Sequence, residues 1–95
     1  MIPVRNPQYC VYILRSKKDN FLYIGCTNNL TKRVKEHKDG KVVSTKNRLP
    51  IKLIYYEVCL NKKDAYTREK YLKSGMGHRY IKNRLKNYFT LSLKQ

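Results

Sequence analysis

Acidic residues are scarce in this chain of 95 residues. Six Asp and Glu stand against 22 Lys and Arg, which gives a formal net charge of +16 at pH 7. Such an excess goes far beyond what solubility requires, and the summed field of these side chains attracts polyanions. We therefore expect a nucleic acid as the partner, and a merely solvated basic surface is the alternative.

Long apolar runs are also missing. No run approaches the roughly 20 residues that a membrane-spanning helix needs, and no segment resembles a signal peptide. A membrane surface could attract the same charge, but the sequence predicts no membrane partner. A hydrophobic fraction of 41% in a chain of this length suits one core, so residues 1–95 are expected to form a single domain.

Cysteine is rare, and its spacing excludes the common zinc sites. The three cysteines are odd in number and far apart, without the paired spacing that zinc ligands show. Cys10 and Cys59 lie in apolar stretches, where a cysteine usually serves as a small core residue. We predict reduced thiols in a cytoplasmic protein and no catalytic cysteine.

Three stretches have the composition of β-strands. Residues 9–14 and 21–25 are rich in β-branched and aromatic side chains, and the polar turn residues 16–20 separate them. These two strands should form an antiparallel hairpin. Residues 51–58 predict a third strand, which follows a polar, basic loop at residues 41–49.

Three helices are expected between and after the strands. The first begins near Leu30 and runs to about Lys38, with Asn28 or Asn29 as its cap and Gly40 after its end. The second begins after Asn61, with Asp64 in a capping box, and runs to about Ser74, where Gly75 and Gly77 break it. A third helix is marked by apolar residues at i, i+4 and i+7: Ile81, Leu85 and Tyr88. The predicted order is β-β-α-β-α-α, with helices covering the sheet.

Two polar residues lie where the first helix should face the core. Leu30 and Val34 set its apolar stripe, and at about 100° per residue Arg33 and His37 fall on the same side. Such breaks of a local rule often mark functional sites. The alternative is that Arg33 only extends past the stripe and that His37 is a hydrogen-bonded boundary residue.

The second helix places a carboxylate on its apolar side. Ala65, Glu69 and Leu72 recur at i, i+4 and i+7. Glu69 could pair with the neighbouring Arg68, or it could bind a metal ion, because Mg²⁺ commonly takes one or two carboxylates and completes its shell with water and substrate oxygens. Only Glu57 could plausibly join it. Since a two-metal site needs several carboxylates, one metal ion is the prediction.

A family signature runs through these same residues. Val11-Tyr12-Ile13 and Tyr23-Ile24-Gly25, followed by Thr27, Asn28, Leu30, Arg33 and His37 in one register, resemble the signature of the GIY-YIG nucleases. The likeness continues through residues 44–48, the third strand and residues 68–75, so that it covers about residues 9–88. In particular the chain is similar to the small standalone bacterial members, which look like the N-terminal nuclease domain of the excinuclease C subunit.

The resemblance implies a fold and a set of site residues. The fold is an α/β (α+β) domain, a three-stranded antiparallel sheet flanked by three helices, with the site on one face of the sheet. The catalytic residues that it implies are Tyr12, Tyr23, Arg33 and His37, and the metal ligand is Glu69. Two features depart from the family pattern: Cys10 replaces the first glycine, and the family's late asparagine has only Asn83 as an insecure counterpart.

The activity that the resemblance implies is hydrolysis of DNA phosphodiester bonds, with a link to DNA repair. Glu69 would hold Mg²⁺ or Mn²⁺ against the phosphate and the leaving 3′ oxygen, and Arg33 would stabilise charge on phosphorus. Tyr12 would position or deprotonate water, His37 would assist that transfer or merely bond a tyrosine, and Tyr23 would orient water or phosphate. Ordinary strand packing remains the alternative for each tyrosine, and a non-catalytic nucleic-acid-binding module is the alternative for the whole chain.

Basic residues outside this site are expected to contact DNA phosphates without reading bases. They are Lys46 and Arg48 in the loop, and Arg79, Lys82, Arg84 and Lys86 on the third helix. Sequence specificity should be low, with a preference for DNA shape, nicks or single strands. A separate targeting protein would be a further possible partner.

Overall fold

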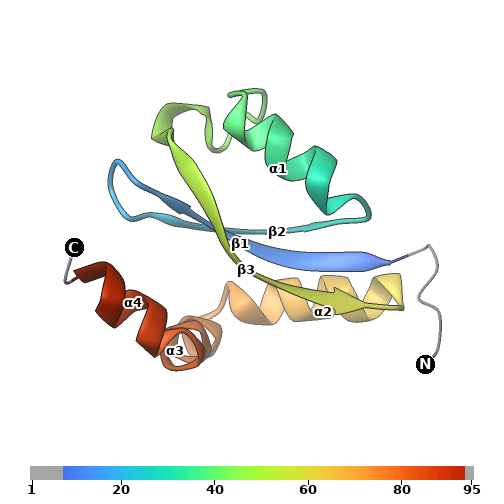
Figure 1. Ribbon diagram of the computed structural model, residues 1–95. Helices are drawn as coiled ribbons and strands as arrows, with labels where there is room; N and C mark the ends of the chain where they lie inside the picture. The colour runs from blue at the N-terminus through green and yellow to red at the C-terminus, as the bar shows by residue number, and fades with distance from the viewer. Residues whose placement is uncertain (1–7, 94–95) are drawn as a thin grey trace, which may run out of the picture.

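The chain folds into a small sheet with helices on both faces (Figure 1). The computed structural model describes residues 8–93. Its elements are β1 (Tyr9–Ser16), β2 (Leu22–Thr27), α1 (Leu30–Lys38), a short 3-10 helix (Lys46–Arg48), β3 (Ile51–Cys59), α2 (Lys62–Leu72), α3 (Gly75–Arg84) and α4 (Lys86–Leu93). The predicted order of strands and helices is confirmed, and so is the α+β class.

The three strands form one antiparallel sheet in the order β2-β1-β3. β1 lies in the middle, and its Tyr12 is opposite Gly25 on β2 and Tyr56 on β3. The register of β1 against β3 shifts between Ile13 and Leu14. The predicted three-stranded antiparallel sheet is therefore confirmed, with the chemistry-bearing first strand at its centre.

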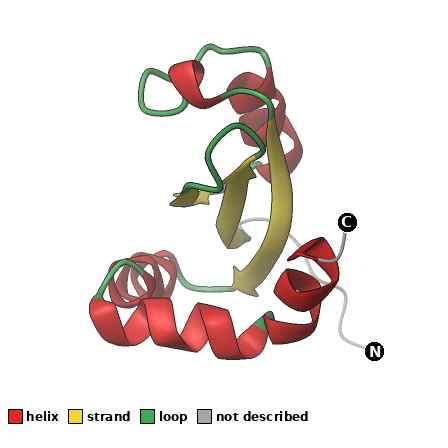
Figure 2. Ribbon diagram, turned by 90° about the vertical axis from the view of Figure 1, so that its left-hand side faces the viewer, coloured by secondary structure: helices red, strands yellow, loops and turns green. Residues whose placement is uncertain are grey.

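Side chains of β1 alternate between two separate cores. Val11 and Ile13 pack with Ala65 and Leu72 of α2 on one face of the sheet. Tyr12 and Leu14 point to the other face and pack with Val34 of α1 and Ile51 of β3. Figure 2 shows the consequence, with α1 on one side of the sheet and the other three helices on the opposite side. Each residue of β1 thus faces one layer of helices only.

Side-chain caps fix where the helices begin. The Asn29 side chain accepts a hydrogen bond from the Lys32 backbone N–H at 3.1 Å, and Asn61 does the same for Lys63 at 2.8 Å. Both bonds satisfy a backbone donor that a helix leaves open at its first turn. The bounds of α1 agree with those expected from sequence, and α2 ends at Leu72, two residues before its expected end.

The last helical segment differs from the expectation in two ways. Gly75 and Gly77 do not separate elements but lie in the first turn of α3, and Ser74 is its cap. The single third helix expected from sequence is divided at Leu85 into α3 and α4. On either side of this turn, Leu85 and Phe89 pack against the core cluster on the α2 side.

The loop between α1 and β3 is present as predicted, but it is not fully solvated. It contains the short 3-10 helix, and both Val42 and Thr45 are buried. Within residues 8–93 no helix combines the length and apolar character that would let it cross a bilayer.

Candidate active site

Three buried polar side chains form a hydrogen-bonded chain between β1, α1 and the following loop. The Tyr12 hydroxyl lies 3.0 Å from Nε2 of His37, and Nδ1 of His37 lies 2.7 Å from the Thr45 hydroxyl. None of the three is more than 1% exposed. The interior position predicted for His37 is confirmed, and its two ring nitrogens are both used.

Tyr23 and Gly25 of β2 complete the surroundings of the Tyr12 phenol. The Tyr23 ring centroid is 4.9 Å from that of His37 and 6.2 Å from that of Tyr12. Gly25 lies directly across from Tyr12, and a Cβ atom there would collide with the Tyr12 hydroxyl and its ring carbon Cζ. The glycine of the second motif therefore makes the space in which the Tyr12 hydroxyl meets its partners.

Burial makes both titratable groups of this chain more difficult to ionise. It raises the pKa of Tyr12 to about 12, while the Arg33 guanidinium acts against this rise by stabilising the phenolate. Burial also lowers the pKa of His37, and the positive charge of Arg33 adds to that effect. At neutral pH Tyr12 therefore carries its proton, and His37 is uncharged.

Arg33 lies at the edge of this cluster. Its side chain is 38% exposed, and its Nη1 is 3.3 Å from Oε1 of Glu36. The guanidinium thus lies between buried Tyr12 and solvent, a place from which it can contact both the phenol and an approaching anion. The predicted core-facing side of α1 is confirmed for His37 and holds only in part for Arg33.

Glu69 comes from α2, which packs on the face of the sheet opposite α1. The expectation that one face of the sheet carries the whole site is therefore wrong for the helix that bears Glu69. Its side chain is 20% exposed and its Oε2 is 3.2 Å from Nζ of Lys73. Its negative charge contributes to the raised pKa values of Tyr12 and of Cys26 on β2. The structure thus joins Tyr12, Tyr23 and His37 directly, whereas Glu69 acts on Tyr12 through its charge and makes no contact of the kind that links the other three.

Glu57 and Arg68 are engaged with each other. Arg68 binds Glu57 through Nε and Nη2, both at 2.9 Å, and the Tyr55 hydroxyl donates to the same carboxylate at 2.8 Å. Arg68 lowers the pKa of Glu57 and also lies 4.4 Å over the Tyr80 ring. The interpretation of Glu69 as the partner of Arg68 is therefore wrong. Glu57 was the one carboxylate expected to be able to join Glu69 at a metal ion, and both of its oxygens are bound by Arg68.

The donor set fits a hard cation held by few protein ligands. Within residues 8–93 no three His, Cys, Asp or Glu side chains gather into a ligand cluster. Mg²⁺ is commonly bound through one or two carboxylates, with water and phosphate oxygens as its other ligands. Among residues 8–93, Glu69 is partly exposed and has Lys73 as its ion-pair partner, so its carboxylate is suited to this kind of binding.

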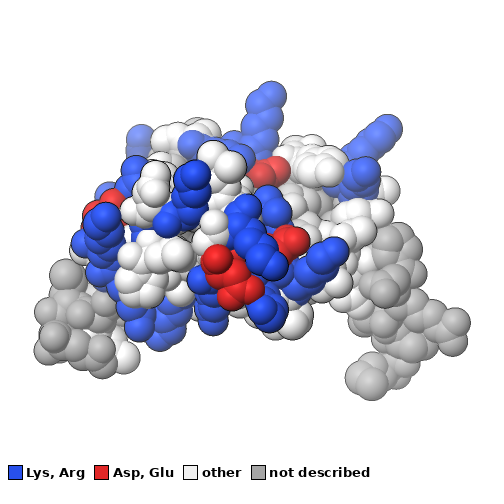
Figure 3. Space-filling model, turned by 90° about the horizontal axis from the view of Figure 1, so that it is seen from above, with Lys and Arg blue, Asp and Glu red and all other residues white. Residues whose placement is uncertain are grey.

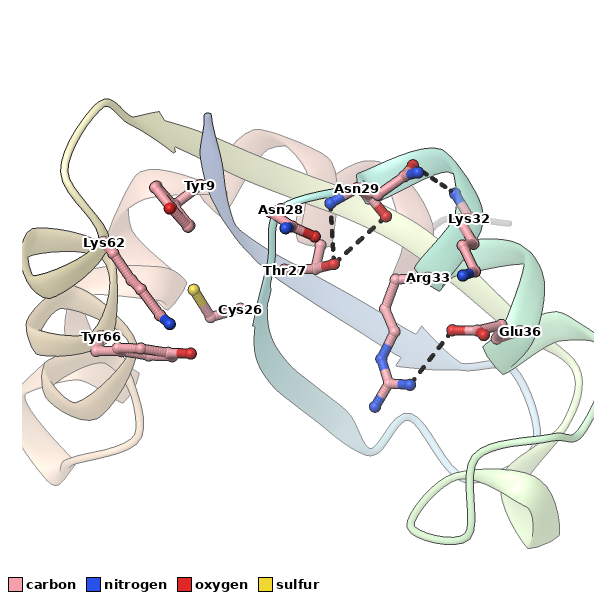
Figure 4. A pocket seen from close by; sticks show the side chains of 10 residues that line it. All are labelled: Tyr9, Cys26, Thr27, Asn28, Asn29, Lys32, Arg33, Glu36, Lys62 and Tyr66. Atoms are coloured by element: carbon pink, nitrogen blue, oxygen red, sulfur yellow. Dashed lines mark hydrogen bonds and ion pairs between the residues drawn. The ribbon is translucent and has the colours of Figure 1, made fainter. Parts of the chain in front are cut away.

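A polar hollow of about 520 Å³ lies between α1 and α2 at the end of β2. Its lining residues are Tyr9, Cys26, Thr27, Asn28, Asn29, Lys32, Arg33, Glu36, Lys62 and Tyr66. Figure 4 shows Lys62 and Tyr66 on the α2 side and Arg33 with Glu36 on the α1 side. Arg33 lines the hollow and also acts on Tyr12. The hollow offers ammonium, guanidinium, amide and phenol groups to a polyanion.

The basic residues predicted to contact DNA do not share one surface. Lys46 and Arg48 lie on the α1 side of the sheet, where Figure 3 shows Lys and Arg spread widely over the surface. Arg48 already forms an ion pair with Asp19 and lies 3.9 Å over the Phe21 ring. The other four are exposed on α3 and α4, on the opposite side: Arg79, Lys82, Arg84 and Lys86.

Asn83 lies apart from the tyrosine cluster. It is exposed on α3 and borders a shallow hollow lined also by Tyr71, Met76, Arg79 and Tyr80. Thr45, in contrast, joins the cluster. It lies within residues 44–48, where the family resemblance continues, but no role was predicted for it. It lies in a polar, basic loop without periodicity, and only the folded chain brings it to His37.

The structure combines a small α+β sheet, a buried tyrosine and histidine pair, an arginine at its edge and a basic surface. The comparison with known families assigns this combination of features to a class of protein. The chain belongs to the GIY-YIG family, because the family model described as the GIY-YIG catalytic domain matches residues 8–83.

Bacterial relatives of similar size match much of the chain. It is 50% identical over 64 residues to UPF0213 protein CPE1444 of Clostridium perfringens, covering 66% of this chain and 68% of that protein. It is 40% identical over 92 residues to a UPF0213 protein of Pediococcus pentosaceus, covering 96% and 95%. UPF0213 protein YazA of Bacillus subtilis is 46% identical over 63 residues, and the match spans 63% of that relative, less than two thirds of its length. The names of these relatives describe no reaction.

Proposed function

We propose that this chain is a metal-dependent DNA endonuclease that uses one metal ion and has little sequence specificity. The observation that supports this best is the buried contact between the Tyr12 hydroxyl and Nε2 of His37 at 3.0 Å, with the guanidinium of Arg33 beside it. A buried acid and base in contact, next to a cation on a basic surface, is an arrangement suited to moving a proton near a phosphate.

Glu69 is the residue proposed to hold Mg²⁺ or Mn²⁺. Its carboxylate is partly exposed. Among the described residues, the Lys73 ammonium is the only cation within 4 Å of this carboxylate. The bound metal ion would supply stabilisation of negative charge on the phosphate and on the leaving 3′ oxygen.

Tyr12 and His37 would together accept the proton of the attacking water. A phenol with a pKa of about 12 is a poor base by itself, so its proton must leave as the proton of water arrives. Nε2 of His37 is placed to take it. The water oxygen forms a bond to phosphorus, the bond to the 3′ oxygen breaks, and each proton moves one step along the chain from water to Tyr12 and from Tyr12 to His37.

Arg33 and Tyr23 would act on the phosphate. Arg33 is partly exposed and can only donate hydrogen bonds, so it is suited to stabilising the charge that develops on the phosphate oxygens. Tyr23 packs its ring on His37 at 4.9 Å, and its hydroxyl would be a second donor for water or phosphate. The contacts outside the site would be to the DNA backbone, which accounts for the low sequence specificity.

A plasmid assay tests this proposal. Purified wild type and Glu69→Ala would be incubated with supercoiled plasmid and Mg²⁺ or Mn²⁺, and DNA binding would be measured in parallel by gel shift. We expect nicking by wild type, little or none by the variant, and binding by both. If wild type and Glu69→Ala both bind DNA but nick it equally little, the proposal of an endonuclease is rejected.

A nucleic-acid-binding module without turnover is the second candidate. The observation that favours it is the burial that raises the pKa of Tyr12 to about 12, because it opposes the phenolate that hydrolysis needs. The plasmid assay separates the two candidates, since the binding module would shift DNA and leave it intact. For either function we propose the cytoplasm as the location, because all three cysteines are free.

A further inference from the structure

We infer that Thr45 is a positioning residue, whose hydroxyl accepts a hydrogen bond from Nδ1–H of His37 and so keeps Nε2 unprotonated toward Tyr12. The catalytic value of this arrangement rests on the proposed function. The arrangement itself is a property of the folded chain, and it can be measured whether or not the chain cleaves DNA.

The ring of His37 has two partners and one proton to share between them. Tyr12 lies at Nε2 and Thr45 at Nδ1, at 3.0 and 2.7 Å. Both partners are hydroxyl groups that can donate or accept, so distance alone permits two tautomers. Because the ring is 0% exposed, the choice depends on the buried neighbours.

Arg33 favours one of the two tautomers. A guanidinium can only donate hydrogen bonds, so the side of the Tyr12 oxygen that faces Arg33 should carry lone pairs. The stabilising effect of Arg33 on the Tyr12 phenolate agrees with this orientation. The hydrogen of the Tyr12 hydroxyl is then directed away from Arg33, toward Nε2. Nε2 must be unprotonated to accept it, so the ring proton is on Nδ1 and donates to Thr45.

The fold holds Thr45 firmly in this place. Its backbone N–H bonds to the carbonyl of Val42 at 3.1 Å, in a loop that turns back after α1 at Gly40, which has φ of +75°. The loop is attached to the sheet where the Ser16 hydroxyl donates to the carbonyl of Arg48 at 2.6 Å. Thr45 itself is 1% exposed. The loop therefore presents one specific hydroxyl to His37.

A hydroxyl at this position acts on Tyr12 through the histidine. With the ring proton held at Nδ1, His37 is ready to accept the Tyr12 proton and does not compete by donating to the phenol. Partners that orient a metal-bound histidine through its far nitrogen commonly change activity by roughly 10–100-fold when they are removed, and we expect an effect of about that order at His37. Thr45 would thus be needed for proton acceptance without touching water or phosphate.

Nitrogen-15 NMR of the imidazole rings tests the inference directly. The chain has two histidines, and exposed His78 serves as an internal reference for a ring in solvent. We expect His37 of the wild type to show a protonated Nδ1 and an unprotonated Nε2. Thr45→Ser should keep that pattern, and the near-isosteric Thr45→Val should move the proton toward Nε2.

An Nε2–H tautomer in the wild type, or an unchanged tautomer in Thr45→Val, would overturn the inference. The wild-type and Thr45→Ser spectra decide the matter if Thr45→Val does not fold. In steady-state cleavage, Thr45→Val should lower kcat roughly 10-fold or more with little change in KM, and Thr45→Ser should recover the wild-type kcat. A wild type that shows the expected tautomer but no cleavage would reject the proposed function and leave the inference standing.

Discussion

Tyr12 depends on residues from four parts of the chain. β1 places it, Gly25 of β2 gives its hydroxyl room, α1 supplies His37, and the loop supplies Thr45. Because burial raises its pKa to about 12, the phenol is useful in catalysis only with an acceptor in contact. The pairing with His37 is therefore the feature on which the proposed chemistry depends.

Removal of one hydroxyl tests this pairing. Tyr12→Phe keeps the ring and should lower DNA cleavage by roughly 100-fold or more, because the proton path is lost. It should also destabilise the fold by about 1–2 kcal/mol, since a buried nitrogen of His37 loses its partner. Tyr56→Phe is the matched control, because Tyr56 lies opposite Tyr12 on β3 and is 52% exposed. Cleavage rates and urea unfolding of both variants measure the effect, and equal rates would contradict it.

Burial of neutral His37 should make the fold sensitive to mild acid. Its pKa in the folded chain is below the ordinary value of 6.5, because burial and Arg33 disfavour the charged ring. Below about pH 6.5 the unfolded chain binds a proton that the folded chain does not, so stability is full above that pH and falls as the pH drops. Thermal unfolding between pH 7.5 and 5 should show this loss in wild type and in His78→Gln.

His37→Gln should reduce the loss, because the titrating group is gone. A similar acid sensitivity in His37→Gln and wild type would mean that another group is responsible. Carboxylates such as Glu57, whose pKa Arg68 holds below its ordinary value of 4.5, titrate at lower pH and leave this window clear.

Single residues were predictable where a local pattern places them. Helical phase put His37 inside, and it is buried. Thr45 was not predictable, because its contact with His37 closes a loop whose course no periodicity describes. The same limit applies to the pairing of Arg68 with Glu57, which joins a position on α2 to a strand residue eleven positions earlier.

The end of α2 packs closely against the first turn of α3, and a substitution at Gly77 tests this contact. A Cβ atom on Gly77 would collide with the backbone of Tyr71 and Leu72 at the end of α2. Gly77→Ala should therefore destabilise the fold by about 1–3 kcal/mol in urea unfolding. Gly75→Ala has nothing within 4 Å of the new Cβ, and it should be neutral or stabilise by up to about 1 kcal/mol. Equal effects of the two substitutions would show that α3 is not packed as described.

The elements themselves could largely be predicted from sequence. Strand composition and the Asn caps located β1, β2, β3 and α1 to within about three residues, because these signals are local. The break between α3 and α4 was missed, since Ile81, Leu85 and Tyr88 continue one helical stripe across it. In the folded chain Leu85 and Phe89 pack on the core on either side of the turn, a contact that local spacing does not place.

The charge of the whole molecule should dominate DNA binding. With a net charge of +16, binding is expected to weaken steeply with salt as counterions are released from the DNA. Lys82→Ala should lower the slope of log affinity against log salt by about one unit. Lys35→Ala should change it less, because Asp39 already lies 2.6 Å from that ammonium group. Binding titrations at several salt concentrations measure the slope, and a flat dependence would contradict a phosphate-based interface.

Single-turnover cleavage of fully bound DNA, with Mg²⁺ present, tests the central claim most directly. The proteins to compare are wild type, Glu69→Gln and Asp64→Asn, since Asp64 is an exposed carboxylate on the same helix. Wild type and Asp64→Asn should cleave at similar rates, and Glu69→Gln should be slower by roughly 100-fold or more, because the metal ligand is lost. Cleavage by Glu69→Gln at the wild-type rate, or intact DNA in all three complexes, would contradict a metal-dependent nuclease centred on Glu69.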